Sequence, residues 1–325
     1  MIRRARLKAF AKLNLGLRVL YKRPDGYHEL RTIFQTISLA DRITVCFEPA
    51  RKAHIEIGGA PEIEDNLLTR AAALVLEQLR VRGRVSFQLE KAIPMGAGLG
   101  GGSSDAAAVL LALPVLVGKT LAGERARAIA LELGSDVPFF LHGGTALGMG
   151  RGEELYPLPD LCRSPVLVVA PEIHSSTVQA YRDLSPRLTT ESLQNKLLSF
   201  QQEVWQGASA SALKRESAPP LERESPSALN DFEEVVFARH PELRSVRDRL
   251  RRTGARCAAM TGSGSAIFGI FDDSASLERA RSMFPRDRVF SVSFLSRAQY
   301  RSAWKRALKQ HTEGDQWPPR SLYAQ

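Results

Sequence analysis

The chain has 325 residues, of which 44% are hydrophobic and 25% are charged, a balance typical of a globular protein. No apolar run reaches the ~18 residues that a membrane-spanning helix needs. The formal net charge is +10, but aromatic residues are not interleaved with the basic clusters as single-strand binders require. We therefore predict neither a membrane partner nor a nucleic-acid partner.

The cysteines and the first residues indicate the compartment. Cys46, Cys162 and Cys257 lie far apart, without metal-ligand spacing and in an odd number, which favours a reducing environment. The N-terminal stretch MIRRARLKAF is basic but lacks the apolar core of a secretory signal. We expect a cytoplasmic protein that is a monomer or a weak homodimer.

The length indicates two domains, at a prior of ~150 residues per domain. We place the boundary near Asp160–Ser164, which gives a first domain at 1–160 and a second domain at 161–300. Residues 207–229 are rich in Ser, Ala and Pro and are predicted to be a mobile insertion. Residues 301–325 are predicted to be a C-terminal tail, of which the last residues, QWPPRSLYAQ (316–325), are predicted to be loose.

Helix and strand patterns alternate along the chain. The spacing predicts a helix over 66–79 with Asn66 as its N-cap, and then a strand over 85–89. A buried strand follows at 166–170, and a helix with one apolar face ends at Gly254. Two apolar runs around TGSGS (261–265) predict a strand–turn–strand unit. We predict an α+β fold of two domains, each with a sheet rich in antiparallel pairs and helices on one face.

The segment IPMGAGLGGGSSDAAA (93–108) is the most unusual part of the sequence, because five of the seven residues from Gly96 to Gly102 are glycine. Such density costs stability, and it is expected where a backbone must come close to a ligand, often a phosphate. A helix follows directly, with Ser103 or Ser104 predicted to cap a start near Asp105. A helix N-terminus offers free amides and a positive dipole to an anion.

Other known types of glycine-rich loop fit this segment poorly. A Walker A loop needs a lysine, and none lies between Gly96 and Asp105. Gly96, Gly98 and Gly101 match a dinucleotide fingerprint, but no second strand with an acidic residue follows ~20 residues later. The His-Arg-Asp and Asp-Phe-Gly signatures of protein kinases are absent. A plain tight turn would need only one or two glycines.

The segment PMGAGLGGGSSDAA closely resembles the phosphate loop of the galactokinase, homoserine kinase, mevalonate kinase and phosphomevalonate kinase (GHMP) superfamily. Within it, AKLNLGL (11–17), DGYHEL (25–30), GSDVPFFL (134–141) and TGSGSA (261–266) resemble the 4-diphosphocytidyl-2-C-methyl-D-erythritol kinase family, in the same order. The chain departs from this family in residues 207–229, in GTALGMGRGEEL (144–155) and in its tail.

The resemblance implies a two-domain GHMP-kinase-like fold with the active site in the cleft between the domains. It also implies phosphorylation of the substrate's 2-hydroxyl by ATP, with Mg²⁺, in the non-mevalonate isoprenoid pathway. The ATP-binding positions that it implies are Pro94, Met95, Gly96, Ala97, Gly98, Leu99, Gly100, Gly101, Gly102, Ser103 and Ser104. Ser104 is a candidate magnesium ligand, although it fits a helix cap equally well.

Two charged residues are the catalytic candidates. Asp136 ends the stretch Gly-Ser-Asp, an ordinary turn signal that would place it at the surface. The apolar run after it would instead carry it toward the interior, so the residues alone leave a surface position and a functional role open. Lys12 shares a predicted strand face with Asn14, although a lone strand lysine more often faces solvent. The resemblance implies that Asp136 is the base, that Lys12 assists it and that Asn14 lies in the site.

The stretch RPDGYHELRT (23–32) would by default be a surface turn with a half-buried tyrosine. The resemblance implies that Tyr27 stacks on a cytosine and that His28 reads its edge. Tyr181, in STVQAYRD, is where the family carries a second aromatic ring. The substrate would then be a cytidine-diphosphate-linked methylerythritol.

Three alternatives to this function are open. The substrate of another small-alcohol kinase, such as homoserine or mevalonate, has no base on which an aromatic ring could stack. The segment DGYHEL therefore speaks against this alternative. A nucleotide-binding regulator would have no reason to keep both Lys12 and Asp136. A dinucleotide-dependent oxidoreductase lacks the acidic residue.

Overall fold

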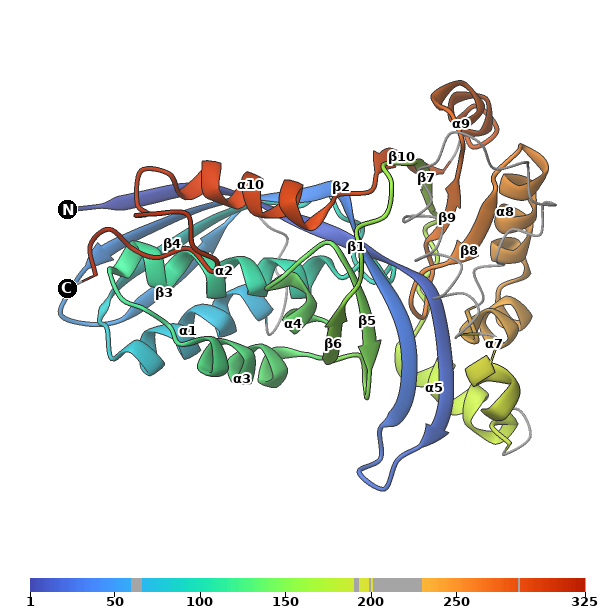
Figure 1. Ribbon diagram of the computed structural model, residues 1–325, viewed down its shortest axis with the longest axis horizontal. Helices are drawn as coiled ribbons and strands as arrows, with labels where there is room; N and C mark the ends of the chain where they lie inside the picture. The colour runs from blue at the N-terminus through green and yellow to red at the C-terminus, as the bar shows by residue number, and fades with distance from the viewer. Residues whose placement is uncertain (60–65, 190–192, 199, 201–229, 286, 325) are drawn as a thin grey trace.

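The computed structural model describes residues 1–324 apart from 60–65, 190–192, 199, 201–229 and 286. Two sheets organise these residues (Figure 1). The first sheet has six strands: β1 (Arg3–Lys22), β2 (His28–Pro49), β3 (His54–Gly58), β4 (Gly83–Glu90), β5 (Thr145–Met149) and β6 (Glu154–Pro157). Its order is β3-β4-β2-β5-β6, with β1 paired to β2, and only the β3–β4 pair is parallel.

The two longest strands, β1 and β2, reach from the first unit to the second. β1 and β2 pair from Arg3 opposite Phe47 to Lys22 opposite His28, with register shifts at three places along the way. Figure 1 shows this ribbon curving out of the first sheet toward α5 (Thr177–Leu184). Leu17 and Val19, near its far end, are buried in the core of the second unit. One hairpin therefore contributes to both cores.

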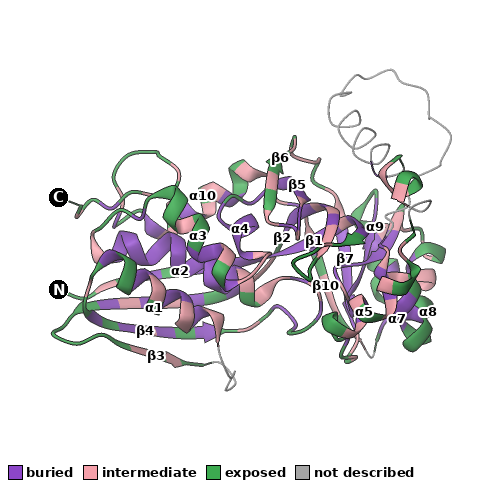
Figure 2. Cartoon of the chain, turned by 90° about the horizontal axis from the view of Figure 1, so that it is seen from below, coloured by how far each residue is buried: buried purple, intermediate pink, exposed green. Residues whose placement is uncertain are grey.

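In the first unit, α1 (Leu67–Leu79) and α2 (Gly101–Val117) pack on the sheet, and α3 (Gly123–Leu133) and α4 (Val137–Phe140) pack on these helices. The Asn66 side chain accepts a hydrogen bond from the Leu68 backbone, which confirms the predicted N-cap of α1. The α2 sequence is apolar on all sides, and the helix is buried from Ser104 to Leu116 (Figure 2). A helix without a polar face belongs inside a protein.

The predicted start of α2 is wrong. The helix begins at Gly101, and its N-cap is Gly100, which has a φ of 72° and no capping side chain. This left-handed backbone, which glycine adopts without strain, lets the chain enter the helix before the serines. The Ser104 hydroxyl instead donates a 2.7 Å hydrogen bond to the carbonyl of Phe10, so it ties α2 to β1.

The second sheet is antiparallel and has the order β10-β7-β9-β8. Its strands are β7 (Pro165–Ala170), β8 (Cys257–Met260), β9 (Ile267–Ile270) and β10 (Arg288–Ser293). Besides α5, this unit includes the 3₁₀ turn η1 (Ser185–Arg187), α7 (Phe232–Arg239), α8 (Pro241–Arg252) and α9 (Ser274–Arg281). The predicted strand at 166–170, the strand–turn–strand unit and the apolar face of α8 are confirmed.

The C-terminal residues pack on the first unit, and residues 316–324 are not loose as predicted. In α10 (Arg297–Leu308), Tyr300 and Trp304 belong to the core of the first unit. Beyond the helix, His311 Nε2 lies 2.9 Å from the carbonyl oxygen of Arg4, and the Ser321 hydroxyl donates to the Val115 carbonyl at 2.7 Å. The two termini thus lie at the same end of the molecule (Figure 1). The domain boundary at 160/161 stays a prediction, and 207–229 lies outside the described residues.

None of the helices that the structure describes has the length and apolar character needed to cross a membrane.

An ion cluster beneath the glycine-rich loop holds three elements together. The Lys91 ammonium donates to Asp41 at 2.5 Å and to Asp105 at 2.8 Å. The other Asp41 oxygen accepts from the backbone of Ala92 and Ile93, where β4 leads into the loop. Among the described residues, Asp105 Oδ1 has no hydrogen-bond partner, and burial raises the pKa of Asp105 to about 7.

This raised pKa predicts a particular dependence of stability on pH. An unfolded aspartate titrates near ~4, so the folded chain binds this proton more tightly, and the resulting stabilisation is lost as pH rises from ~4 through ~7. Asp105→Asn is always neutral, so its free energy of unfolding should rise relative to the native chain between pH 5 and pH 8. Urea unfolding at each pH measures the difference.

Asp272→Asn, which removes an exposed carboxylate paired with Arg256, is the control for the loss of a negative charge. A difference for Asp105→Asn that stays constant between pH 5 and pH 8 would contradict the prediction.

Candidate active site

A cavity of roughly 800 Å³ lies between the two units. Both units line it: the β1–β2 hairpin, the glycine-rich loop and the turn before α4 from the first, and α5 with the TGSGS turn from the second. All the predicted catalytic and substrate-binding residues line it, namely Lys12, Asn14, Tyr27, His28, Asp136 and Tyr181. The structure therefore brings together residues that are widely separated in the sequence.

Lys12 and Asp136 form an ion pair at this cavity. The ammonium Nζ of Lys12 lies 3.3 Å from Asp136 Oδ2 and donates a 2.6 Å hydrogen bond to Asn14 Oδ1. Lys12 is almost fully buried, whereas a third of the Asp136 side chain is exposed. Asn14 is itself held by Thr32, whose hydroxyl accepts from its amide at 2.8 Å. This chain of contacts fixes the ammonium while the carboxylate faces the cavity.

The local sequence explains how Asp136 is placed. It directly precedes α4, whose four side chains, Val137–Phe140, are all buried. The apolar turn anchors the backbone, so the carboxylate is held at the rim of the core. A carboxylate beside an ammonium, both facing a cavity, is suited to orient a hydroxyl group and to accept its proton.

The glycine-rich loop faces the second unit as well as the cavity. Gly96, Gly98 and Gly100 have φ angles of 66°, 75° and 72°, and all three line the cavity. A Cβ on Gly98 would lie only 2.1 Å from the carbonyl oxygen of Thr261. The Thr261 hydroxyl donates to the Gly98 carbonyl at 3.1 Å. The loop therefore needs glycine at position 98 in order to contact the second unit, apart from any need to bring its backbone close to a ligand.

The aromatic residues lie at the hairpin end of the cavity. The rings of His28 and Tyr181 stack with their centroids 4.6 Å apart, and the Tyr181 ring also meets the edge of Phe232. His28 Nε2 lies 2.8 Å from the Ser185 hydroxyl oxygen. Tyr27 is half exposed, and the guanidinium of Arg151 lies over its ring. One face of Tyr181 is thus occupied by His28, not by Tyr27.

Burial keeps both polar aromatic groups neutral. It lowers the pKa of His28, with a smaller contribution from nearby Lys22. Burial, together with the charge of Asp136, raises the pKa of Tyr181 to about 12. At neutral pH, an uncharged imidazole and an intact phenol therefore face the cavity.

Two functional candidates were not found from the sequence. Thr261 joins Asn14 to the glycine-rich loop, because its hydroxyl oxygen accepts from the Asn14 backbone at 3.1 Å. Arg151 lines the cavity from the turn between β5 and β6. The signal for Arg151 was the segment GTALGMGRGEEL, which departs from the family pattern and places a glycine on each side of the arginine.

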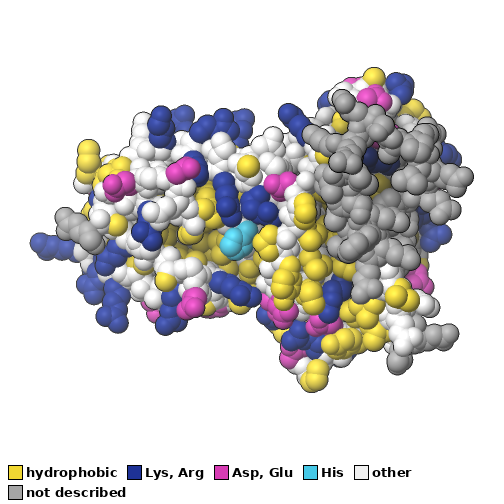
Figure 3. All heavy atoms as spheres, viewed as in Figure 1, with side chains coloured by type: hydrophobic (Ala, Val, Ile, Leu, Met, Phe, Trp, Pro, Cys, Tyr) yellow, Lys and Arg dark blue, Asp and Glu magenta, His cyan; other side chains and the backbone are white. Residues whose placement is uncertain are grey.

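The basic side chains on the surface bear on the prediction about nucleic acid. On the face in Figure 3, Lys and Arg side chains are spread over several places and do not form one continuous patch. The absence of a nucleic-acid partner stays a prediction.

Comparison with known proteins defines the class. Residues 66–144 match the GHMP kinases N terminal domain, and residues 209–288 match the GHMP kinases C terminal family. The second match begins within the segment where we expect an insertion. Homoserine kinase from Cytophaga hutchinsonii shares the fold, with a TM-score of 0.68 at 17% identity over 89% of this chain and 94% of that one. The fold is that of a GHMP kinase, and the chain contains both of the domains that define this class.

Closer relatives define the family. The 4-diphosphocytidyl-2-C-methyl-D-erythritol kinase of Solibacter usitatus is 52% identical over 99% of this chain and 98% of its own length. The enzyme of that name from Acaryochloris marina is 38% identical over 84% of this chain and 88% of its own. A crystal structure of 4-(cytidine 5'-diphospho)-2C-methyl-D-erythritol kinase superposes with a TM-score of 0.71 at 38% identity, covering 90% and 99% of the two chains. This chain belongs to the 4-diphosphocytidyl-2-C-methyl-D-erythritol kinase family.

The close approach at Gly98 predicts a difference between two glycines of one loop. Gly98→Ala places a methyl group against the Thr261 backbone at a strained φ. Its free energy of unfolding should therefore be at least ~2 kcal/mol lower than that of the native chain. Gly102→Ala should be tolerated, because its nearest neighbour would be a leucine methyl group at 3.7 Å and its φ is not left-handed. Urea unfolding compares them, and equal stability of the two variants would contradict the packing that we describe.

Proposed function

We propose that this chain transfers the γ-phosphoryl group of ATP to the 2-hydroxyl of 4-diphosphocytidyl-2-C-methyl-D-erythritol, a step in the formation of isoprenoid precursors by the non-mevalonate pathway. The observation that carries the proposal is the Lys12–Asp136 pair, held at 3.3 Å between the glycine-rich loop and the aromatic residues of the hairpin. The names of the relatives in the same family support this choice of substrate.

ATP would bind with its phosphates on the loop from Pro94 to Ser104. Gly96, Gly98, Gly100 and Ser103 line the cavity, and α2 begins directly behind them. Backbone amides at a helix N-terminus are well suited to a triphosphate, because they present donors and a positive dipole end together. Placing the phosphates there would bring the γ-phosphoryl group toward Lys12, whose backbone donates to the Leu99 carbonyl at 3.0 Å.

A magnesium ion would accompany the ATP. Among the described residues, no group of three or more His, Cys, Asp or Glu side chains could hold a metal ion. Ser104 is a poor ligand, because its hydroxyl is buried and donates to Phe10. Ser103 lines the cavity and would hold the ion together with phosphates and water, as magnesium often prefers. The ion would neutralise charge on the transferred group.

Phosphoryl transfer requires mainly positioning and charge stabilisation, and the pair supplies both. Asp136 would accept a hydrogen bond from the 2-hydroxyl and take its proton as the oxygen attacks the γ-phosphorus. The bond from this phosphorus to the bridging β-phosphate oxygen would break, and ADP would leave. Lys12 would stabilise the negative charge on the oxygens of the transferred group, since its ammonium cannot turn away while Asn14 holds it.

The cytosine would bind at the hairpin end, between Tyr27 and Tyr181, with His28 at its edge. The His28–Tyr181 stack is in the way, but such ring pairs contribute only ~1 kcal/mol, which a stacked base would offset. His28 would then turn its neutral imidazole to the polar edge of the base. A cytoplasmic location and a monomer or weak homodimer remain part of this proposal.

Replacing the carboxylate tests the chemistry. Asp136→Asn keeps the shape but removes the proton acceptor, so turnover should fall roughly 10²- to 10⁴-fold while ATP affinity stays nearly constant. Lys12→Ala should lower turnover to a similar extent. The assay is coupled ADP release at saturating substrates, with ATP affinity from calorimetry.

The control for this test is Asp183→Asn, which removes a carboxylate on α5 that pairs with Arg239 and does not line the cavity. The proposed mechanism fails if Asp136→Asn keeps more than a tenth of native turnover. Mevalonate and homoserine in the same assay test the choice of substrate, and turnover with either at the rate of the cytidyl substrate would refute it.

Tyr27 tests the base-binding end. Loss of a stacked ring costs about 1–3 kcal/mol, so Tyr27→Ala should raise the KM for the cytidyl substrate roughly 5- to 150-fold. Because the base is remote from the reacting hydroxyl, kcat should change little. Tyr27→Phe should retain most of the affinity.

Tyr156 on β6 is a matched control, because it is exposed to the same degree as Tyr27, 52% against 53%, and lies outside the cavity lining. Equal KM values for Tyr27→Ala and Tyr156→Ala would exclude Tyr27 from the substrate site.

A further inference from the structure

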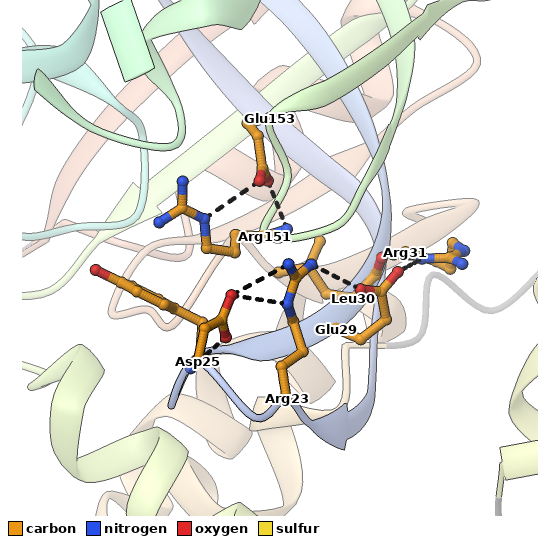
Figure 4. Close-up of polar contacts among 8 residues, drawn as sticks. Arg23, Asp25, Glu29, Leu30, Arg31, Arg151 and Glu153 are labelled. Atoms are coloured by element: carbon orange, nitrogen blue, oxygen red, sulfur yellow. Dashed lines mark hydrogen bonds and ion pairs between the residues drawn. The ribbon is translucent and has the colours of Figure 1, made fainter. Parts of the chain in front are cut away.

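The turn between β5 and β6 holds one arginine in a fixed orientation. Gly150 and Gly152 have φ angles of 67° and 104°, and this backbone folds the Glu153 carboxylate back under Arg151. Glu153 accepts a 2.5 Å hydrogen bond from the Arg151 backbone and a 3.2 Å bond from its Nε (Figure 4). The Gly150 carbonyl also accepts from the Leu30 backbone at 2.8 Å, so the turn is attached to β2.

The arginine is held from a second side by an aromatic ring. Its guanidinium carbon lies 4.5 Å from the centroid of the Tyr27 ring, within the range of a cation–π contact. Among the described residues, the side-chain hydrogen bonds of Arg151 use Nε alone. The two terminal amino groups point away from Glu153 in Figure 4, and the residue lines the cavity. They are therefore oriented donors without an assigned acceptor.

The charge of the cavity favours an anion at this place. Its lining contains the cations Lys12, Lys22, Arg151 and Arg182, and among the described lining residues Asp136 is the one carboxylate. Lys12 is already engaged by Asn14 and Asp136. Lys22 and Arg182 are exposed, whereas Arg151 is held on two sides.

We propose that Arg151 binds the diphosphate of the substrate's cytidine diphosphate group through its two terminal amino groups, while its guanidinium rests on Tyr27. This inference rests on the proposed function, which places the base against the same Tyr27 ring. The diphosphate is joined to the base through one ribose, so it must leave the base-binding end beside this ring. The planar fork of arginine matches two phosphate oxygens at once, which lysine cannot do.

A competing role for Arg151 is to support the Tyr27 ring alone. The two roles differ in which part of the ligand gains affinity. An arginine that only supports the ring stabilises the base and therefore strengthens cytidine and CDP equally. An arginine that binds the diphosphate strengthens CDP selectively.

The experiment is calorimetric titration of the full chain with CDP and with cytidine at one ionic strength. Charge-assisted hydrogen bonds of this kind predict that Arg151→Gln weakens CDP about tenfold or more and leaves cytidine within twofold. Arg151→Lys keeps the charge but not the planar fork, so its affinity for CDP should lie between those of the native chain and of Arg151→Gln. An equal loss for both ligands, or no loss for CDP, overturns the proposal.

Arg23→Gln is the matched control. Arg23 belongs to the same β1–β2 hairpin as Tyr27 and pairs with Asp25 and Glu29 (Figure 4), but it does not line the cavity. Its loss removes the same charge and should leave the CDP-to-cytidine ratio unchanged. A ratio that falls as much as in Arg151→Gln would show a general charge effect and overturn the proposal.

Native turnover separates this inference from the proposed function. If the native chain phosphorylates the cytidyl substrate while Arg151→Gln binds CDP normally, only the role of Arg151 is refuted. If the native chain neither turns over this substrate nor binds CDP, the proposed function is refuted and the role of Arg151 with it.

Discussion

The antiparallel pairing of β1 with β2 is the constraint on which the rest of the structure depends. Along β1, Ala5, Leu7, Ala9 and Phe10 pack in the first core. Lys12 and Asn14 face the cavity, and Leu17 with Val19 pack in the second core. A strand alternates its faces at every residue, so a slip of one residue would bury different side chains in both cores. The position of the Lys12 ammonium is therefore fixed by hydrophobic packing on both sides of it.

The same constraint makes a buried lysine tolerable. Removing an ammonium from water costs several kcal/mol unless partners replace the lost hydration. Asn14 lies on the same strand, and Asp136 is fixed by the buried apolar turn that follows it. Thr261 then joins Asn14 to the glycine-rich loop, so the second unit completes the polar network of the first. The ion pair and the contact between the units therefore support each other.

Local signals explain what could be predicted from the sequence. The Asn66 cap and the strand before the glycine-rich loop depend on neighbouring residues alone, and both are found as expected. The α2 start was missed because Gly100 takes a left-handed conformation that the serine signals do not reveal. The packing of the last residues was missed because its partners are remote: Ser321 and Val115 are 206 positions apart. Arg151 likewise acquires meaning only when the fold places Tyr27 beside it.

The distribution of cations along the cavity follows from what a kinase of this kind must bind. Two polyphosphate ligands must share one cavity, and their mutual repulsion must be offset without a cluster of metal-binding carboxylates, which the described residues lack. The buried Lys12 is placed where charge would move during the reaction, and backbone amides at α2 need no counter-charge of their own. Arg151, at the hairpin end, lies with Tyr27 where the proposal puts the nucleotide of the acceptor substrate. Positive groups at both ends of the cavity would hold the two anions apart and still leave the central carboxylate of Asp136 free to meet the hydroxyl.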